Sequence, residues 1–300
     1  MDRMFFMCQK IIELNTNIRD QETIDLIAAS IMSIFIDRGK TTLDVIPEIL
    51  QKTNIISDNR SVLEVEHQVI NNYKEDKKLA DSKACVTRLF SFDGDKCFEK
   101  RYLIAPKANI HNNPINTIEQ IIHELIHLLR FQNAVRTGNK LVFKEGVSTK
   151  TIDLDKNTTY RKNYMLEETI VQIYTKKAMN SLFTYSDNIH NNPLFNKINL
   201  SKDTYQSKVY DVYVKLFDKF MDDPTFNSLV ENTFKVASSN DLESYFNRIM
   251  DDNEAFTKLS HYFNKLNQFL EADDVDSAKK VIACILHQYN IFKSKTGIKK

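Results

Sequence analysis

Glycine and proline are scarce in this chain, which has only five of each among its 300 residues. These two residues supply many of the sharp turns that a many-stranded β-fold requires. Leucine, isoleucine, lysine and glutamate are abundant and favour helices instead. With 42% hydrophobic and 27% charged residues, the composition is that of a globular chain and not of a disordered or fibrous one. We therefore expect a predominantly helical protein.

Closely spaced cysteine pairs are absent, which argues against a structural zinc cluster and against a small disulfide scaffold. Cys85 and Cys97 flank a predicted hairpin, whose expected register places Cys97 opposite Phe90 and Cys85 near Tyr102. We therefore expect no disulfide between them. Reduced thiols are typical of a cytoplasmic protein, although export without a signal would leave the same pattern. The four cysteines are Cys8, Cys85, Cys97 and Cys284.

A strong excess of charge and a long apolar run are also absent. The net charge of +1 and the pI near 7.6 give no electrostatic reason to bind nucleic acid or an anionic membrane. The longest apolar run, Leu26 to Ile36, contains two serines and is too short to span a bilayer, so we expect a core helix there. Asp2 and Cys8 interrupt the pattern of a secretory signal. These features predict a cytoplasmic protein without a membrane span.

The spacing of apolar residues divides the chain into a helical N-terminal region (1–75), a mixed region (76–186) and a helical C-terminal region (187–300). Helices are expected in the two outer regions at residues 4–14, 21–38, 42–52, 60–74, 203–221, 224–236, 240–250, 253–271 and 273–295.

The mixed region alternates between predicted strands and helices. Residues 85–106 have the β-branched and aromatic alternation of a hairpin that turns at Asp93 and Gly94. A helix should run from Pro114 to about Asn133. A second hairpin at 140–154, around Gly146, and a second long helix at 163–183 follow. The expected fold class is therefore α+β, predominantly helical, with a small antiparallel sheet.

The first of these two helices carries the segment IIHELIHLLRFQ. His123 and His127 are one helical turn apart, so both imidazoles can reach one metal ion, and Glu124 lies between them in the sequence. Burying three polar side chains without partners would cost free energy, and binding of a zinc ion would offset that cost. The apolar residues around them are Ile118, Ile121, Ile122, Leu125, Ile126, Leu128 and Leu129.

A catalytic zinc normally takes a third protein ligand. No histidine occurs between His127 and His190, which excludes a third histidine at short spacing. The segment MLEETIVQIY on the second helix offers Glu167 and Glu168. The helical period alone does not separate these two glutamates, and both also suit the first turn of a helix as surface charges.

HELIH followed by a helix that opens with LEET resembles the gluzincin class of zinc metallopeptidases, in which two histidines and a glutamate bind the metal. In many of these enzymes the second helix reads Asn-Glu-x-x-x-Asp, or Leu-Asn-Glu-Gly in a set of small bacterial proteins. That motif places Leu166 on the Leu, Glu167 on the Asn, Glu168 on the ligand Glu and Gln172 on the Asp. The resemblance therefore selects Glu168 as the third ligand and gives Gln172 the role of accepting a hydrogen bond from a ligand histidine.

The resemblance also implies a zincin-like catalytic core, one Zn²⁺ ion and a peptide or protein substrate. Glu124 would be the general base, and Tyr160 and Tyr164 are candidates for stabilising the oxyanion. The strand at 100–106 would pair with an extended substrate. The alternative is a zinc-binding protein with little or no catalytic activity, in which the core is a scaffold for a regulatory partner.

Overall fold

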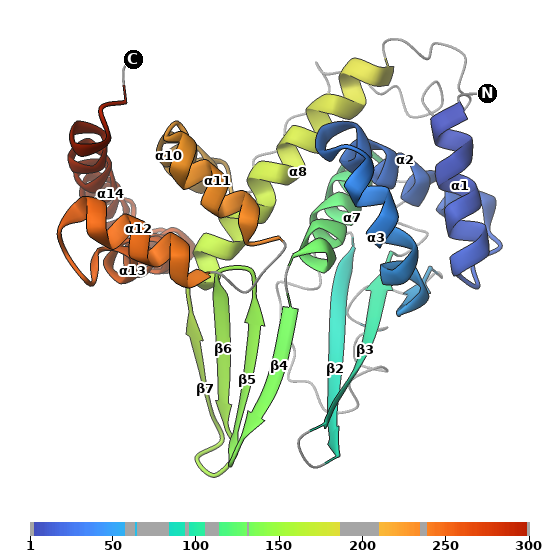
Figure 1. The fold of residues 1–300 in the computed structure, drawn as a ribbon, viewed down its shortest axis with the longest axis horizontal. Coiled ribbons are helices and arrows are strands. Elements are labelled where there is room, and N and C mark those ends of the chain that lie inside the picture. Colours follow the sequence, from blue (N-terminus) through green and yellow to red (C-terminus); the bar gives the residue numbers. More distant parts are fainter. Residues whose placement is uncertain are drawn as a thin grey trace. The chain divides into compact units, whose positions relative to one another are not determined.

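The computed structural model describes residues 3–57, 64, 84–93, 96–105, 114–130, 132–186, 210–234 and 239–298 (Figure 1). The chain is mostly helical with two small sheets, which confirms the expected α+β, predominantly helical class. It forms two units, of which one contains Met1–Leu129 and Tyr174–Ser207 and the other contains Arg130–Ile173 and Lys208–Lys300. The boundaries expected from the sequence, after residues 75 and 186, stay a prediction, and the helix expected at 60–74 lies outside the described residues apart from Glu64.

The first unit begins with three helices that closely match the expected ones. They are α1 (Arg3–Asn15), α2 (Gln21–Arg38) and α3 (Lys40–Gln51). Every residue of α2 from Leu26 to Ile34 is buried, so the apolar run is a core helix as predicted. Its two serines meet their hydrogen-bonding needs within the helix, since Ser30 Oγ donates to the carbonyl of Leu26 and Ser33 Oγ to that of Ser30. Among the described helices, none is long and apolar enough to cross a membrane.

The predicted hairpin is present as β2 (Cys85–Asp93) and β3 (Lys96–Ile104). The strands remain paired as far as the turn, where Asp93 lies opposite Lys96. The expected register was wrong, because Cys97 lies opposite Phe92 instead of Phe90, and Cys85 lies opposite Ile104. The two cysteines are at opposite ends of the ladder, so this register gives them no opportunity to form a disulfide.

The strand expected to pair with a substrate is the central one of this sheet. A short strand that the sequence did not predict, β1 (Thr53–Ile56), runs parallel to β3, and the strand order is β1-β3-β2. One edge of β3 is paired with β2 along its whole length, and β1 covers the other edge from Arg101 to Ile104. An extended peptide cannot add to an edge that is already paired, so the assignment of substrate binding to 100–106 was wrong.

The second unit begins with a four-stranded antiparallel meander in the order β4-β5-β6-β7. Its inner strands form the expected hairpin around Gly146, whereas β4 and β7 were not predicted. The strands are β4 (Gln132–Thr137), β5 (Lys140–Glu145), β6 (Ser148–Asp153) and β7 (Thr158–Lys162). The chain then enters α8 (Tyr164–Ser186), a continuous helix whose residues from Tyr174 onward belong to the first unit.

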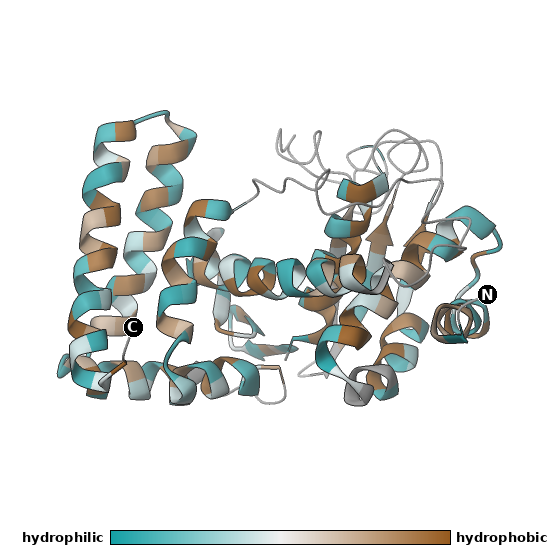
Figure 2. Ribbon diagram, turned by 90° about the horizontal axis from the view of Figure 1, so that it is seen from above, coloured by the Kyte–Doolittle hydropathy of each residue, from teal (hydrophilic) through white to brown (hydrophobic). Residues whose placement is uncertain are grey.

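Five helices follow in the described part of the second unit. They are α10 (Asp211–Met221), α11 (Pro224–Asn232), α12 (Ser239–Met250), α13 (Ala255–Glu271) and α14 (Val275–Thr296). Hydrophilic and hydrophobic residues alternate along the helices near the C-terminus, as amphipathic helices require (Figure 2). Their apolar faces meet in an aromatic core, in which Phe246 stacks on Phe292 with ring centroids 5.3 Å apart. The fully buried members of this core are Phe217, Phe220, Phe226, Phe246, Phe256, Phe263 and Phe292.

Removing one ring from this core should destabilise the second unit strongly. Phe246→Ala should lower the free energy of unfolding by about 3–5 kcal/mol, because it deletes a fully buried ring and leaves a cavity. Leu270→Ala on α13 is the control, since Leu270 is exposed and should cost less than about 0.5 kcal/mol. Chemical denaturation followed by circular dichroism measures both, and similar losses in the two variants would contradict this account of the core.

Candidate metal centre

The helix that carries the HELIH segment is α7 (Pro114–Leu129). It begins at a proline, which has the fixed φ and missing N–H that suit a first helical turn. It ends four residues earlier than expected from the sequence, and β4 starts directly after the next two residues. The helix packs against α2, α3 and β2 within its unit. Its buried residues are Thr117, Ile118, Glu119, Ile121, Ile122, Leu125, Ile126 and Leu128.

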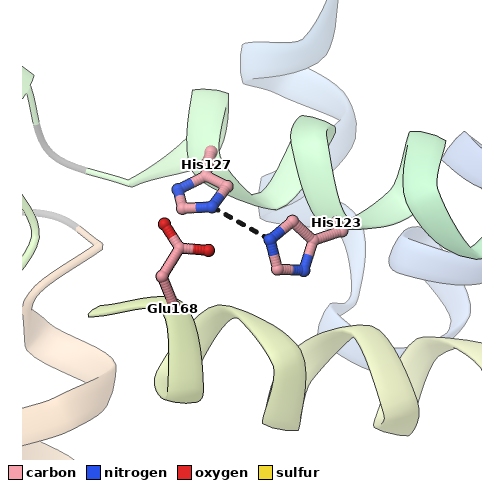
Figure 3. Close-up of side chains that lie close together, drawn as sticks. All are labelled: His123, His127 and Glu168. Carbon is pink, nitrogen blue, oxygen red and sulfur yellow. Dashed lines mark hydrogen bonds between the residues drawn. The ribbon is translucent and has the colours of Figure 1, made fainter. Parts of the chain in front are cut away.

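The two histidines of α7 face one another. Their Nε2 atoms are 3.1 Å apart, and the rings meet edge to face with centroids separated by 4.8 Å (Figure 3). Two nitrogens that ligate one tetrahedral zinc at about 2.0–2.1 Å lie about 3.3–3.4 Å from each other. The spacing between His123 and His127 is therefore close to that of two ligands of one ion. It also suits an N–H···N hydrogen bond in which one ring donates to the other.

Glu168 of α8 completes a group of three potential ligands with this pair. One ring nitrogen of each histidine and one carboxylate oxygen of Glu168 lie within 4.8 Å of one another, and all three residues are half-buried (Figure 3). Two imidazoles and one carboxylate form a ligand set that catalytic zinc sites use. These three residues could thus hold a metal ion.

Glu167, the other candidate, has a different set of partners. The guanidinium of Arg130 binds it through two parallel hydrogen bonds, from Nε to Oε1 at 2.6 Å and from Nη2 to Oε2 at 2.9 Å. The backbone N–H of Val147 also donates to Oε2 at 2.8 Å. The side chains of Arg130 and Glu167 are 0% and 2% exposed, so this is a buried bidentate ion pair.

A second group of potential ligands contains His127, Glu145 and Glu167. Both carboxylate oxygens of Glu167 already accept hydrogen bonds from Arg130, whose positive charge would repel a cation bound beside it. We therefore favour the group that contains Glu168. The structure separates the two neighbouring glutamates, which the helical period did not.

Glu124 is held against the sheet of its unit. Its Oε2 accepts a hydrogen bond from the backbone N–H of Val86 at 3.0 Å. Val86 belongs to β2, an edge strand, so this N–H points away from β3 toward α7. One turn earlier on α7, Gln120 Oε1 accepts in the same way from the N–H of Ala84 at 2.8 Å. The edge of β2 therefore fixes the side chains on this face of α7.

The other residues expected at the site have clear positions but no tested role. Tyr160 lies on β7 and is 68% exposed. Tyr164 is the first residue of α8, one turn before Glu168, and the guanidinium of Arg161 lies 5.0 Å from its ring centroid. Gln172, one turn after Glu168, is buried. The roles of the two tyrosines and of Gln172 stay predictions.

The role of Arg130 and the packing around it were not expected from the sequence. Gly146, in the turn between β5 and β6, has a φ of +50°, and a Cβ at this position would collide with Arg130 and Glu167. The side chain of Asn163, which itself has a φ of +59°, donates to the carbonyl of Val147. The ring of Phe234 lies 4.5 Å from the guanidinium of Arg130, a cation–π contact. An arginine placed directly after an apolar helix was the only signal in the sequence.

Comparisons of this chain with models of protein families, with curated proteins and with solved structures find no match.

Two glycines with similar backbone conformations allow a test of the space around the ion pair. Gly138→Ala should cost about 1 kcal/mol, because its φ of +57° disfavours a side chain but no atom lies near the new methyl group. Gly146→Ala should cost about 3 kcal/mol or more, since the methyl group also pushes Arg130 and Glu167 apart. Urea denaturation measures the difference. Equal losses would mean that the turn does not enclose the ion pair.

Proposed function

We propose that this protein is a zinc-dependent metallopeptidase of the gluzincin type, with a zincin-like core that includes α7 and the start of α8. The observation that supports the proposal best is the grouping of His123, His127 and Glu168, which combines two imidazoles with a carboxylate from a separate helix. The HELIH segment also supplies Glu124 beside the first histidine, and such a glutamate can act as the general base in amide hydrolysis.

The residues of the chain have separate roles in this mechanism. His123, His127 and Glu168 would hold one Zn²⁺, which would make water a better nucleophile and polarise the scissile carbonyl. Glu124 takes a proton from the water while the water oxygen forms a bond to the carbonyl carbon. When the C–N bond breaks, Glu124 passes this proton to the leaving nitrogen. Tyr164, one turn before Glu168, is better placed than the exposed Tyr160 to donate to the oxyanion.

A peptide substrate would pair with the part of β2 beyond Val86 instead of with β3. Because β2 is at the edge of its sheet and donates the Val86 N–H to Glu124, it is the strand of this sheet that lies next to the proposed base. The N–H groups of Ala84 and Val86 already donate to side chains of α7, so a peptide cannot use them. Backbone hydrogen bonds along such an edge hold a peptide in an extended conformation. The register of this pairing would set which amide lies beside Glu124.

The alternative function is a zinc-binding regulatory protein with little or no activity. It is favoured by the hydrogen bond from Val86 to Glu124, which occupies an oxygen of the proposed base. Gln172 also stands where the gluzincin pattern has an acid, and an amide raises the basicity of a ligand histidine less than a carboxylate does.

A cytoplasmic location is also part of the proposal. In the described part of the chain, Cys8, Cys85 and Cys284 are not in disulfide bonds. Reduced thiols fit a reducing compartment, and they are equally compatible with export that needs no signal.

The proposal predicts that zinc binding and hydrolysis can be separated at Glu124. Glu124→Gln should keep one zinc per chain and lower the rate of peptide hydrolysis by about 10²–10⁴-fold or more, because the amide cannot accept the proton. His123→Ala should lose both zinc and activity. Elemental analysis and an assay on an unstructured protein substrate measure the two properties. Full activity in Glu124→Gln would reject the mechanism, and stoichiometric zinc without any turnover would support the regulatory alternative.

The neighbouring glutamates provide a second test. Glu168→Gln should change the free energy of unfolding of the metal-free protein by less than about 1 kcal/mol but weaken zinc binding by more than about 100-fold. Glu167→Gln should cost about 3–5 kcal/mol of stability, because Arg130 is left buried without a counter-charge. Denaturation and zinc titration distinguish these outcomes. If zinc affinity depended on Glu167 and not on Glu168, the assignment of the third ligand would be wrong.

A further inference from the structure

The four-stranded sheet of the second unit has no buried side chain in any of its strands. Its buried residues, Gly146 and Val147, lie in the turn between β5 and β6. In Figure 1 the strands extend beyond α12 and α13, which lie near one end of the sheet. An antiparallel sheet normally packs one face against other elements and exposes the other. Within this unit, neither face of the sheet is therefore fully covered.

The register of the strands shows which side chains share a face. Phe143 lies opposite Ala134 on one side and Lys150 on the other, and Lys150 lies opposite Arg161. Directly opposite residues point to the same face of an antiparallel sheet, so these four form one row across it. The row is apolar at β4 and β5 and positively charged at β6 and β7.

The next row on the same face has the opposite arrangement. Leu141 lies opposite Arg136 on β4 and Ile152 on β6. The positive charge is now on β4, and the apolar residues are on β5 and β6. Together the two rows form an apolar centre with cations on both sides, which we call the basic face: Arg136, Leu141, Phe143, Lys150, Ile152 and Arg161.

Within the four strands of the sheet, which are described in full, the charges of the basic face have few acidic neighbours. Lys150 and Arg161 are like charges directly opposite each other, an arrangement that destabilises a pair of strands. Burial and the charge of Arg161 lower the pKa of Lys150. Glu145 is the one acidic residue that shares this face. Residues 132–162 contain seven lysines and arginines against three acidic residues, although the whole chain has a net charge of only +1.

We propose that the basic face binds an acidic polypeptide segment, in which carboxylates lie on both sides of aliphatic side chains. The carboxylates would contact Arg136, Lys150 and Arg161, and the aliphatic groups would cover the apolar centre. A nucleic acid fits this surface less well, because half of the face is apolar and Phe143 is its one aromatic residue. The proposal does not depend on hydrolysis, and none of the six residues of the basic face is a potential metal ligand.

The test uses the full chain with Glu124→Gln, so that a bound peptide is not cleaved. Its probe is a short fluorescein-labelled peptide in which glutamates flank valine and leucine, and its readout is fluorescence anisotropy. We expect saturable binding that high salt weakens. Lys150→Glu combined with Arg161→Glu should weaken it by about tenfold or more. This double reversal keeps like charges opposite each other, so it should not disturb strand pairing more than the native pair does.

The matched control reverses two exposed lysines elsewhere in the same unit, Lys215 on α10 and Lys279 on α14. It makes the same change in net charge and should leave the affinity within about twofold. Phe143→Thr tests the apolar centre and should also weaken binding. The proposal is overturned if the probe does not saturate, if the control variant loses as much affinity, or if a lysine-substituted peptide or single-stranded DNA binds equally well.

Discussion

The buried ion pair between Arg130 and Glu167 constrains the chain next to two segments of the candidate site. Arg130 follows the end of α7 directly, and Glu167 directly precedes the candidate ligand Glu168. Two opposite charges in a nearly unexposed position are costly to bury unless they pair and form hydrogen bonds with each other, and removing one partner leaves the other charge buried at high cost. The pair thus constrains the backbone at two places, directly after α7 and in the first turn of α8.

The close packing around this ion pair explains why particular residues occur near it in the sequence. Glycine is required at 146, because the turn from β5 to β6 runs against the guanidinium and the carboxylate. The backbone N–H of the next residue, Val147, donates a hydrogen bond to Glu167. The backbone carbonyl of Val147 accepts a hydrogen bond from the side chain of Asn163. A hairpin that would otherwise be an independent surface element is in this way attached to the first turn of α8.

The sequence predicted what depends on local spacing. The positions of the long helices, the two hairpins and the proximity of His123 to His127 all follow from the helical and strand periods. The sequence did not predict β1, whose four residues become a strand only by pairing with β3. That omission also made β3 look like an edge. The register of the hairpin was misplaced because its turn was expected one residue too early, at 93–94, whereas Asp93 pairs with Lys96. Long-range pairing decides such features, and it leaves little trace in a short segment.

The choice between Glu167 and Glu168 also depends on a long-range contact that the local sequence does not reveal. Both are polar residues in an apolar helix, and each can be explained by a buried partner. What distinguishes them is an arginine more than thirty positions earlier, and nothing in the sequence around either glutamate identifies it. The gluzincin pattern selected Glu168 by analogy, and the structure gives a physical reason for the same choice, since Glu167 is already neutralised by a guanidinium.

The parallel pairing of β1 with β3 also affects how the chain reaches its folded state. Strands β2 and β3 can form a hairpin early, because their contacts are local, whereas β1 must join from a distant part of the chain after a costly loop closure. Until it does, β3 has an open edge that can pair with another molecule. A chain shortened so that it begins after Ile56 would keep the HELIH helix and all three potential metal ligands, yet it would be prone to aggregation through β3.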